Sequence, residues 1–205
     1  PRDHGKSRHA AFYAAWEIIR DPSTTIIYAS ATAEKAEEQL RFIKTILDNK
    51  ITRRYFPGLV YLEEGKREAW NKTFIVVDHP RRKTEGVVDS TLMTCGLEKT
   101  ITGKHCKRLI LDDIVVPENN TETGRRDVNS WAAQAASIMS ADSSMLVVGT
   151  RYHPKDAYQI MKQKGMIEFM TSSFVRGLTF DNAVILVDEC QSMTYHELDT
   201  IITRV

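Results

Sequence analysis

A short run near the start of the chain has the residue types that hold a phosphate group. Gly5 is followed by Lys6 and Ser7, and a helical pattern begins at Lys6. Backbone N–H groups at the start of a helix bind anions, a lysine reaches the outer phosphates, and a serine hydroxyl is a ligand for Mg²⁺. We therefore expect His4, Gly5, Lys6 and Ser7 to bind a nucleotide, with Ser7 also at the metal. Taken alone, a Gly-Lys-Ser sequence is weak evidence, and a surface loop is the better interpretation.

Two carboxylates follow an apolar segment much later in the chain. Residues 109–111 are Leu-Ile-Leu, which predicts a buried strand that ends at Asp112 and Asp113. P-loop enzymes hold Mg²⁺ with a carboxylate delivered from the carboxyl end of such a strand. We expect Asp112 at the metal and Asp113 beside the attacking water. An acidic turn after a core strand explains the pair equally well in isolation, but the Gly-Lys-Ser sequence upstream favours catalysis.

A third polar residue follows another apolar strand. Residues 145–148 predict a buried strand, and Thr150 comes two residues after it. A hydroxyl in that place can bond to the catalytic water or to the γ-phosphate and transmit the state of the nucleotide. Most threonines at strand ends are structural, so this is the weakest of the three indications.

Helical and strand patterns alternate along the chain, which is typical of an α/β fold with a parallel sheet. On the first helix we expect one face to carry Ala11, Phe12, Ala15, Trp16 and Ile19. Predicted helices cover residues 6–20, 33–48 and 126–139, with one more beginning at Pro154 and one after Thr194. Predicted strands cover residues 25–29, 74–77, 91–94, 109–111, 145–148 and 184–187, and residues 57–71 are expected to form a charged surface excursion.

Composition limits the class of protein. The 205 residues are 42% hydrophobic and 27% charged, which is typical of a globular protein with a core of its own. The net charge of +1 argues against an overall basic nucleic-acid coat but permits a local basic track. Cys95, Cys106 and Cys190 form no CxxC pair, so we expect a reducing compartment and no zinc. No apolar run approaches the roughly 20 residues that span a bilayer, so no membrane partner is expected.

With these motifs in order, the sequence resembles the large subunit of tailed-phage terminases over residues 1 to about 170. The matching segments are residues 1–7 (PRDHGKS, their variant phosphate loop), 27–32 (IYASAT), 102–106 (TGKHC) leading to Asp112 and Asp113, and 149–154 (GTRYHP, their coupling motif). The usual earlier glycine and the strand before the phosphate loop are not in the chain. We therefore expect a RecA-like P-loop NTPase fold, a mostly parallel sheet flanked by helices, with its first strand missing from a fragment or trimmed product.

The resemblance implies specific roles for single residues. It gives ATP and Mg²⁺ as cofactors, Lys6 and Ser7 at the nucleotide, and Asp112 at the metal. It gives Asp113 as the residue that activates water, Thr150 as the residue that couples hydrolysis to motion, and Arg2 as a charge stabiliser for the transferring phosphoryl group.

The resemblance also implies partners. Terminases drive double-stranded DNA into a procapsid in the cytoplasm of the infected bacterium, together with a portal and a small subunit. A ring of identical subunits on the portal is compatible with this. No segment matches their C-terminal nuclease, so we expect no DNA cleavage.

The end of the chain resembles a different family, the PhoH-like ATPases. Residues 172–180, 183–191 and 200–204 carry this likeness, and residues 184–187 predict a strand that ends at Asp188 and Glu189. Two such carboxylate strands with one phosphate loop favour a fused chain, with a terminase-like ATPase domain at 1–170 and a PhoH-like segment at 171–205. Asp188 and Glu189 are then idle. The alternatives are an added sheet strand with an acidic end, a PhoH-like ATPase acting on RNA or single strands through Asp188, Glu189 and Arg204, or a catalytically inactive remnant.

Overall fold

The computed structural model describes residues 5–101, 103–166, 194–196 and 199. Contacts divide the chain into two compact units, residues 5–157 and residues 1–4 with 158–205. The larger unit contains the sheet and the helices that cover it, and it contains every described residue that the sequence analysis assigns to the phosphate and metal site.

The sheet of the larger unit has six strands in the order β2-β3-β4-β1-β5-β6. The central strand β1 pairs in parallel with β4 and with β5, and β5 pairs in parallel with β6. The short strands β2 and β3 are antiparallel to their neighbours. The strands are β1 (Ile26–Ser30), β2 (Ala69–Trp70), β3 (Phe74–Val76), β4 (Leu92–Gly96), β5 (Cys106–Asp112) and β6 (Met139–Val148).

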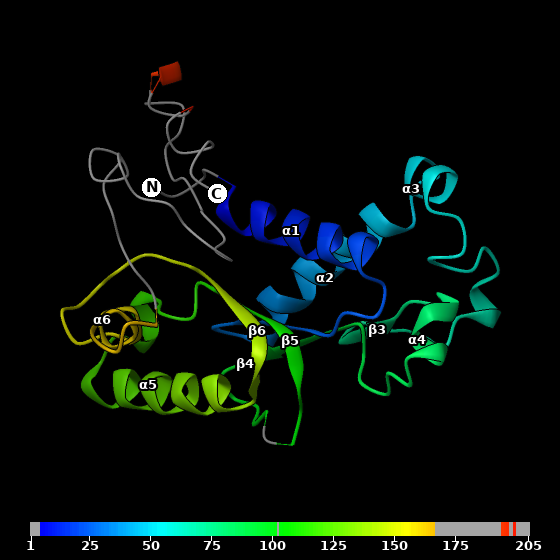
Figure 1. Ribbon diagram of the computed structural model, residues 1–205. Coiled ribbons are helices and arrows are strands. Elements are labelled where there is room, and N and C mark those ends of the chain that lie inside the picture. Colours follow the sequence, from blue (N-terminus) through cyan, green and yellow to red (C-terminus); the bar gives the residue numbers. More distant parts are fainter. Residues whose placement is uncertain (1–4, 102, 167–193, 197–198, 200–205) are drawn as a thin grey trace. The chain divides into compact units, whose positions relative to one another are not determined.

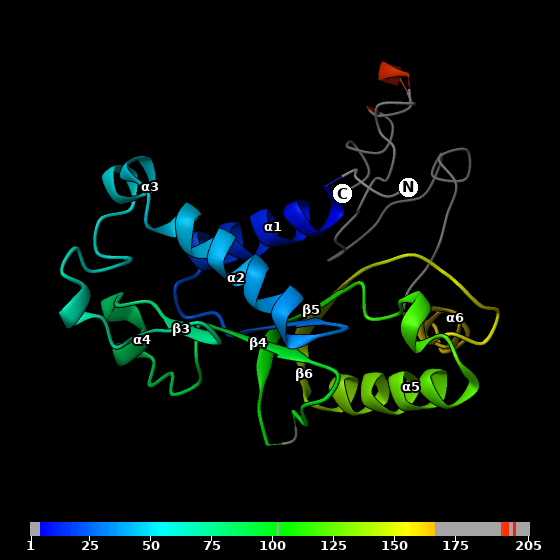
Figure 2. The ribbon, with the colours of Figure 1, turned by 180° about the vertical axis from the view of Figure 1, so that it is seen from behind.

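Helices cover both faces of this sheet. Helices α1 and α2 lie over one face and α5 lies against the other, as the views from two sides show (Figures 1 and 2). The longer helices are α1 (Lys6–Arg20), α2 (Ala33–Leu47) and α5 (Glu122–Ser137). The shorter helical segments are α3 (Lys50–Tyr55), η1 (Glu64–Lys66), α4 (Pro80–Thr84), η2 (Pro117–Asn119) and α6 (Ala157–Gln163). The predicted α/β fold with a mostly parallel sheet between helices is confirmed.

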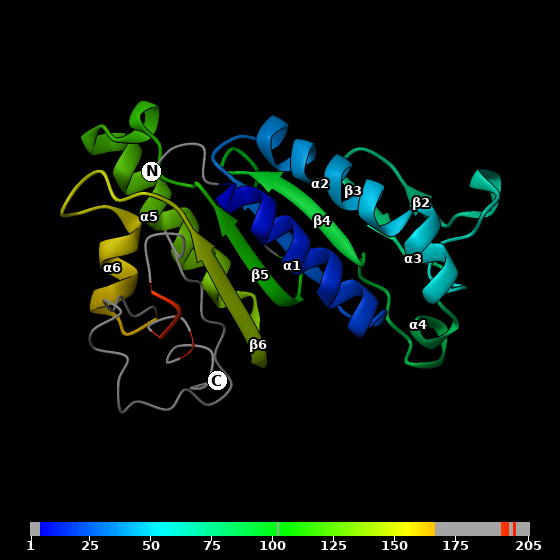
Figure 3. The ribbon, with the colours of Figure 1, turned by 90° about the horizontal axis from the view of Figure 1, so that it is seen from above.

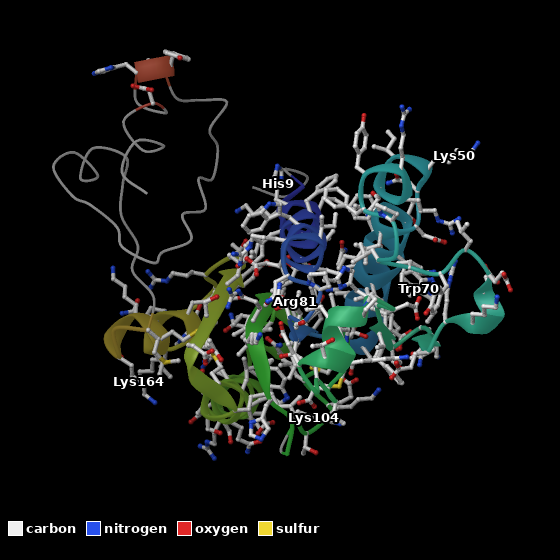
Figure 4. All side chains as sticks on the ribbon, turned by 45° about the vertical axis from the view of Figure 1, so that its right-hand side comes forward. His9, Lys50, Trp70, Arg81, Lys104 and Lys164 are labelled. Carbon is white, nitrogen blue, oxygen red and sulfur yellow. The ribbon has the colours of Figure 1, made fainter. Side chains whose placement is uncertain are left out.

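The core lies between the sheet and the α1–α2 layer. The predicted face of α2 is buried as expected, with Ala36, Leu40, Ile43 and Leu47 all at the sheet. The face of α1 is made almost entirely of alanines, which allow the helix to approach the strands closely. Figure 4 shows the side chains that fill this layer. The buried residues of α1 are Ala10, Ala11, Ala14, Ala15, Glu17 and Ile18.

Two expectations about α1 and its neighbours are wrong. Phe12 and Trp16 lie on the outer side of α1, with 53% and 52% of their surface exposed. The buried face of α1 is formed mainly by alanines, so these two large rings lie on the outer side of the helix. Instead Phe12 packs edge-on against Phe42 of α2, and the guanidinium of Arg20 lies over the Trp16 ring.

The boundaries near β6 also differ from those predicted. Helix α5 starts at Glu122 because Thr121 caps it by accepting a hydrogen bond from the N–H of Gly124. The last predicted helical residue, Met139, is instead the first residue of β6. Pro154 starts no helix, since it lies in a turn and α6 begins at Ala157. The predicted strand at 184–187 lies outside the described residues.

Candidate functional site

The start of α1 lies at the carboxyl end of the central strands. Figure 3 shows α1 and α2 both beginning at the end of the sheet where β4 and β5 finish. Gly5 precedes α1 with a φ of 67°, a left-handed conformation that residues with a β-carbon rarely adopt. The ring of His9 lies against the Gly5 carbonyl, 2.9 Å from it, which braces the turn. Lys6 and Ser7 therefore form the first turn of a helix, as the phosphate-binding interpretation requires.

The structure brings Ser7 and Asp112 together. The Ser7 hydroxyl donates a hydrogen bond to Oδ1 of Asp112 at 2.9 Å, across 105 positions of sequence. Asp112 is the last residue of β5 and is buried. A hydroxyl and a carboxylate side by side at a helix start are the oxygen donors that Mg²⁺ accepts, because this ion keeps several waters and binds few protein ligands. The two residues predicted at the metal thus fit one.

A third residue, Tyr28, completes this cluster and was missed by the sequence analysis. The Tyr28 phenol donates to Oδ2 of Asp112 at 2.7 Å, and Tyr28 has no exposed surface. In the sequence the residue stands in an apolar strand segment, where a tyrosine is typical of the core. No local pattern distinguishes it, because its partner comes from a different strand.

Burial dominates the electrostatics of Asp112. Removal from water raises the pKa of the Asp112 carboxyl, and the hydrogen bonds from Tyr28 and Ser7 counteract part of this rise. A carboxylate held in a buried place by neutral donors lacks a full counter-charge. A cation bound there would supply that charge.

Asp113 has an unusual backbone. Its φ is 48°, and it is the one residue other than glycine with a positive φ in the described part of the chain. Its N–H donates to the Val148 carbonyl at 2.8 Å, which fixes the turn after β5 to the end of β6. Backbone strain of this kind gathers at functional sites.

The charges around Asp113 come from two helices. Burial raises the pKa of the Asp113 carboxyl, while the cations of Lys35 and Lys6 oppose the rise. Lys35 lies in the first turn of α2, and the same cation also acts on Asp112. Lys35 was not among the residues predicted at the site. The strand order points to Lys35, because β1 pairs with β5 so that Ser30 is the neighbour of Asp112. The turn after Ser30 leads directly into α2, which carries Lys35.

The segment after β6 is fixed by a buried carboxylate. Asp156 has no exposed surface, and its Oδ2 accepts hydrogen bonds from the N–H groups of Tyr152 and His153 at 3.0 and 3.2 Å. Thr150 lies between this turn and the end of β6 and is exposed. Of the other predicted site residues, Arg2 and His4 lie outside the described residues, as do Asp188, Glu189 and Arg204.

Other metal sites are not indicated. In the described part of the chain, no group of three or more His, Cys, Asp or Glu side chains is placed to hold a metal ion. Cys95 and Cys106 are buried and unpaired, and burial raises the pKa of the Cys106 thiol to about 11.

Comparison with known proteins identifies the chain at the family level. The model of the family described as PhoH-like protein matches residues 99–205, just over half of the sequence. The chain belongs to the PhoH-like family. A second match is to the protein named "Terminase, large subunit" of Enterobacteria phage T3, with 27% identity over 127 residues. That match covers 62% of this chain and 20% of the phage protein, so the chain spans about a fifth of the length of this relative.

Both resemblances stated from the sequence are therefore confirmed. PhoH-like proteins and terminase large subunits are P-loop NTPases, so this PhoH-like chain is of the P-loop ATPase class. The PhoH-like match begins at residue 99 and so runs across the predicted boundary at 170/171, which stays a prediction. No helix in the described residues is long and apolar enough to cross a membrane.

Proposed function

We propose that the site at the carboxyl end of β5 hydrolyses ATP with Mg²⁺. One observation carries this proposal, the 2.9 Å hydrogen bond between Ser7 at the start of α1 and Asp112 at the end of β5. It joins the predicted phosphate-binding turn to the predicted metal carboxylate, although nothing in the local sequence requires them to meet. The membership of the chain in a P-loop ATPase family supports the same chemistry.

Each residue then has a distinct part. The N–H groups at the start of α1 and the Lys6 ammonium bind the phosphates, together with His4 and Gly5. Ser7 and Asp112 hold Mg²⁺, which when bound neutralises charge on the phosphate oxygens. Asp113, whose pKa is raised by burial, orients the attacking water and accepts its proton. Thr150 senses the γ-phosphate, and Arg2 stabilises charge on the transferring phosphoryl group.

We propose further that hydrolysis drives double-stranded DNA into a phage procapsid. The supporting observation is the likeness to the terminase large subunit of phage T3. In this proposal the chain acts in the cytoplasm of an infected bacterium, with a portal and a small subunit as partners and a ring of identical subunits as the working assembly.

A second candidate function is supported by the family match over residues 99–205. In that case the ATPase acts on RNA or single strands, and turnover depends on Asp188, Glu189 and Arg204. The two candidate functions differ in the carboxylates that catalysis requires: Asp112 and Asp113 in the first, and Asp188 and Glu189 in the second.

The deciding experiment is an ATPase assay with Mg²⁺, run without nucleic acid, with duplex DNA and with single-stranded RNA. Lys6→Ala, Asp113→Asn and Glu189→Gln are compared with the wild-type chain. The first proposal predicts stimulation by duplex DNA, loss of turnover in Lys6→Ala and Asp113→Asn, and little change in Glu189→Gln. Loss of turnover in Glu189→Gln, with stimulation by RNA, would assign the activity to the PhoH-like segment. A wild-type chain that neither binds nor hydrolyses ATP would mark it as a catalytically inactive piece.

A further inference from the structure

Tyr28 lies in the middle of the central strand, yet its phenol reaches the end of the sheet. In the register of β1 and β5, Tyr28 is the neighbour of Ile110 and Ser30 is the neighbour of Asp112. Residues two apart on a strand point to the same face, so Tyr28, Ile110 and Asp112 lie on one side of the sheet. This side carries α1, since the phenol oxygen of Tyr28 is also 3.4 Å from the Ser7 carbonyl. A side chain as long as tyrosine is needed to span the two residues along the strand.

The Tyr28 phenol and the Ser7 hydroxyl bond to different oxygens of the Asp112 carboxylate. Tyr28 donates to Oδ2 of Asp112 at 2.7 Å, and Ser7 donates to Oδ1 at 2.9 Å. A phenol has one proton to donate, and it belongs to the shorter bond to the charged oxygen rather than to the 3.4 Å contact with the carbonyl. With one donor on each oxygen, the plane of the carboxylate cannot turn freely about its Cβ–Cγ bond. Tyr28 therefore occupies Oδ2 and leaves Oδ1 facing the start of α1.

We infer that Tyr28 is a positioning residue for the metal-binding carboxylate, acting through Asp112 rather than on nucleotide or metal directly. The inference rests on the proposed function, because it gives Tyr28 its purpose through Mg²⁺ binding at Ser7 and Asp112. It adds a residue from a third element, β1, to the two elements that carry the phosphate loop and the carboxylate.

A purely structural role for Tyr28 is the competing explanation. A buried phenol needs a hydrogen-bond partner whatever its function, and the ring fills space between α1 and the sheet. The two explanations differ in what removal of the hydroxyl alone would change. Loss of packing affects stability, whereas loss of positioning affects the dependence of nucleotide binding on Mg²⁺.

The test uses Tyr28→Phe, which keeps the ring and removes the hydroxyl. Binding of a fluorescent ATP analogue is measured with Mg²⁺ and with EDTA. Tyr13→Phe is the matched control, because Tyr13 is a partly buried tyrosine of α1 whose neighbours are Glu17 and Ser144 rather than Asp112. We expect Tyr28→Phe to reduce the strengthening of binding by Mg²⁺ about five- to tenfold. We expect binding in EDTA to be unchanged.

A double-mutant cycle with Asp112→Asn tests whether the effect of Tyr28→Phe depends on the Asp112 carboxylate. If Tyr28 acts through Asp112, Tyr28→Phe should change Mg²⁺-dependent binding little once Asp112 is asparagine. The inference is overturned if Tyr28→Phe binds with the Mg²⁺ dependence of the wild-type chain, or if its effect is equally large beside Asp112→Asn. A wild-type chain that binds no nucleotide would overturn the proposed function, and this inference with it.

Discussion

The N–H of Asp113 donates to the carbonyl of Val148 at 2.8 Å, which joins the turn after β5 to the last residue of β6. The bond holds Asp113 at a φ of 48°, a conformation that asparagine adopts about as readily as aspartate but most other residues do not. A change in the position of Asp113 would therefore displace the end of β6, the strand that leads to Thr150. The relation gives the proposed water-activating residue and the proposed coupling residue a direct structural connection.

Asp113→Asn should abolish turnover without disturbing the fold. The amide tolerates the same backbone conformation but cannot accept a proton, so we expect kcat to fall about a hundredfold or more. Binding of ATP with Mg²⁺ should persist, since the phosphate-binding turn and Asp112 are unchanged. Single-turnover hydrolysis and nucleotide titration measure the two separately. Turnover near that of the wild-type chain would remove Asp113 from its proposed role.

The same variant should change how stability depends on pH. Burial raises the pKa of the Asp113 carboxyl above its value in the unfolded chain, so the folded state favours the protonated form. The contribution of Asp113 to stability is therefore greatest at low pH and is lost as the pH rises through the folded-state pKa. Asp113→Asn should melt higher than the wild-type chain at pH 7, and the difference should shrink towards pH 4. Asp127→Asn is the control, because a substitution at this exposed position of α5 should change the melting temperature little.

Ser7→Ala and Ser7→Thr separate the hydroxyl from the helix that carries it. Alanine removes the donor to Oδ1 of Asp112 and a proposed metal ligand, so Mg²⁺-dependent ATP binding should weaken about tenfold. Threonine retains the hydroxyl and should bind close to normally. Isothermal titration at several Mg²⁺ concentrations provides the measurement. Equal loss in both variants would indicate that Ser7 matters for packing rather than for the metal.

Gly96→Ala should destabilise the larger unit. A β-carbon at Gly96 would collide with the backbone nitrogen of Ala33 at the start of α2 and with the Glu98 carboxylate. We expect a loss of about 1–3 kcal/mol of unfolding free energy, because the start of α2 must shift. Gly65→Ala, where a β-carbon meets open space, is the matched control and should unfold at the wild-type urea concentration. Similar midpoints for the two variants would contradict the close approach.

Arg82 and Arg81 are adjacent in sequence but differ in burial. Arg82 is buried and donates to the carbonyls of Pro22, Thr24 and Asp89, whereas the Arg81 side chain is half-exposed and pairs with Glu85. Arg82→Ala leaves three carbonyls without a donor, and we expect a loss of about 3 kcal/mol. Arg81→Ala should change stability little, because exposed ion pairs contribute little. Urea denaturation of the two variants tests this, and equal stabilities would refute it.

Short-range patterns predicted most of the element order. The helix at Lys6–Arg20 and the apolar face of α2 were predicted correctly. Both depend on neighbouring residues: the helical spacing of apolar residues, and the residue before each helix, Gly5 or Thr32. The predictions were wrong where a contact outside the local apolar pattern decides the structure. Pro154 was expected to begin a helix, but the Asp156 carboxylate caps a turn there instead. Trp16 was expected in the core, but the face of α1 that packs against the sheet is formed mainly by alanines.

By itself the sequence determined which residues stand at the ends of elements. Gly5, Lys6 and Ser7 precede or begin a helix, and Asp112 ends an apolar strand, because these outcomes depend on neighbouring residues. Only the tertiary structure decided that Ser7 and Tyr28 share the oxygens of Asp112 and that Asp113 bonds to Val148. Those contacts depend on strand order and register, which the packing of α1 and α2 on the whole sheet selects and which no local pattern encodes.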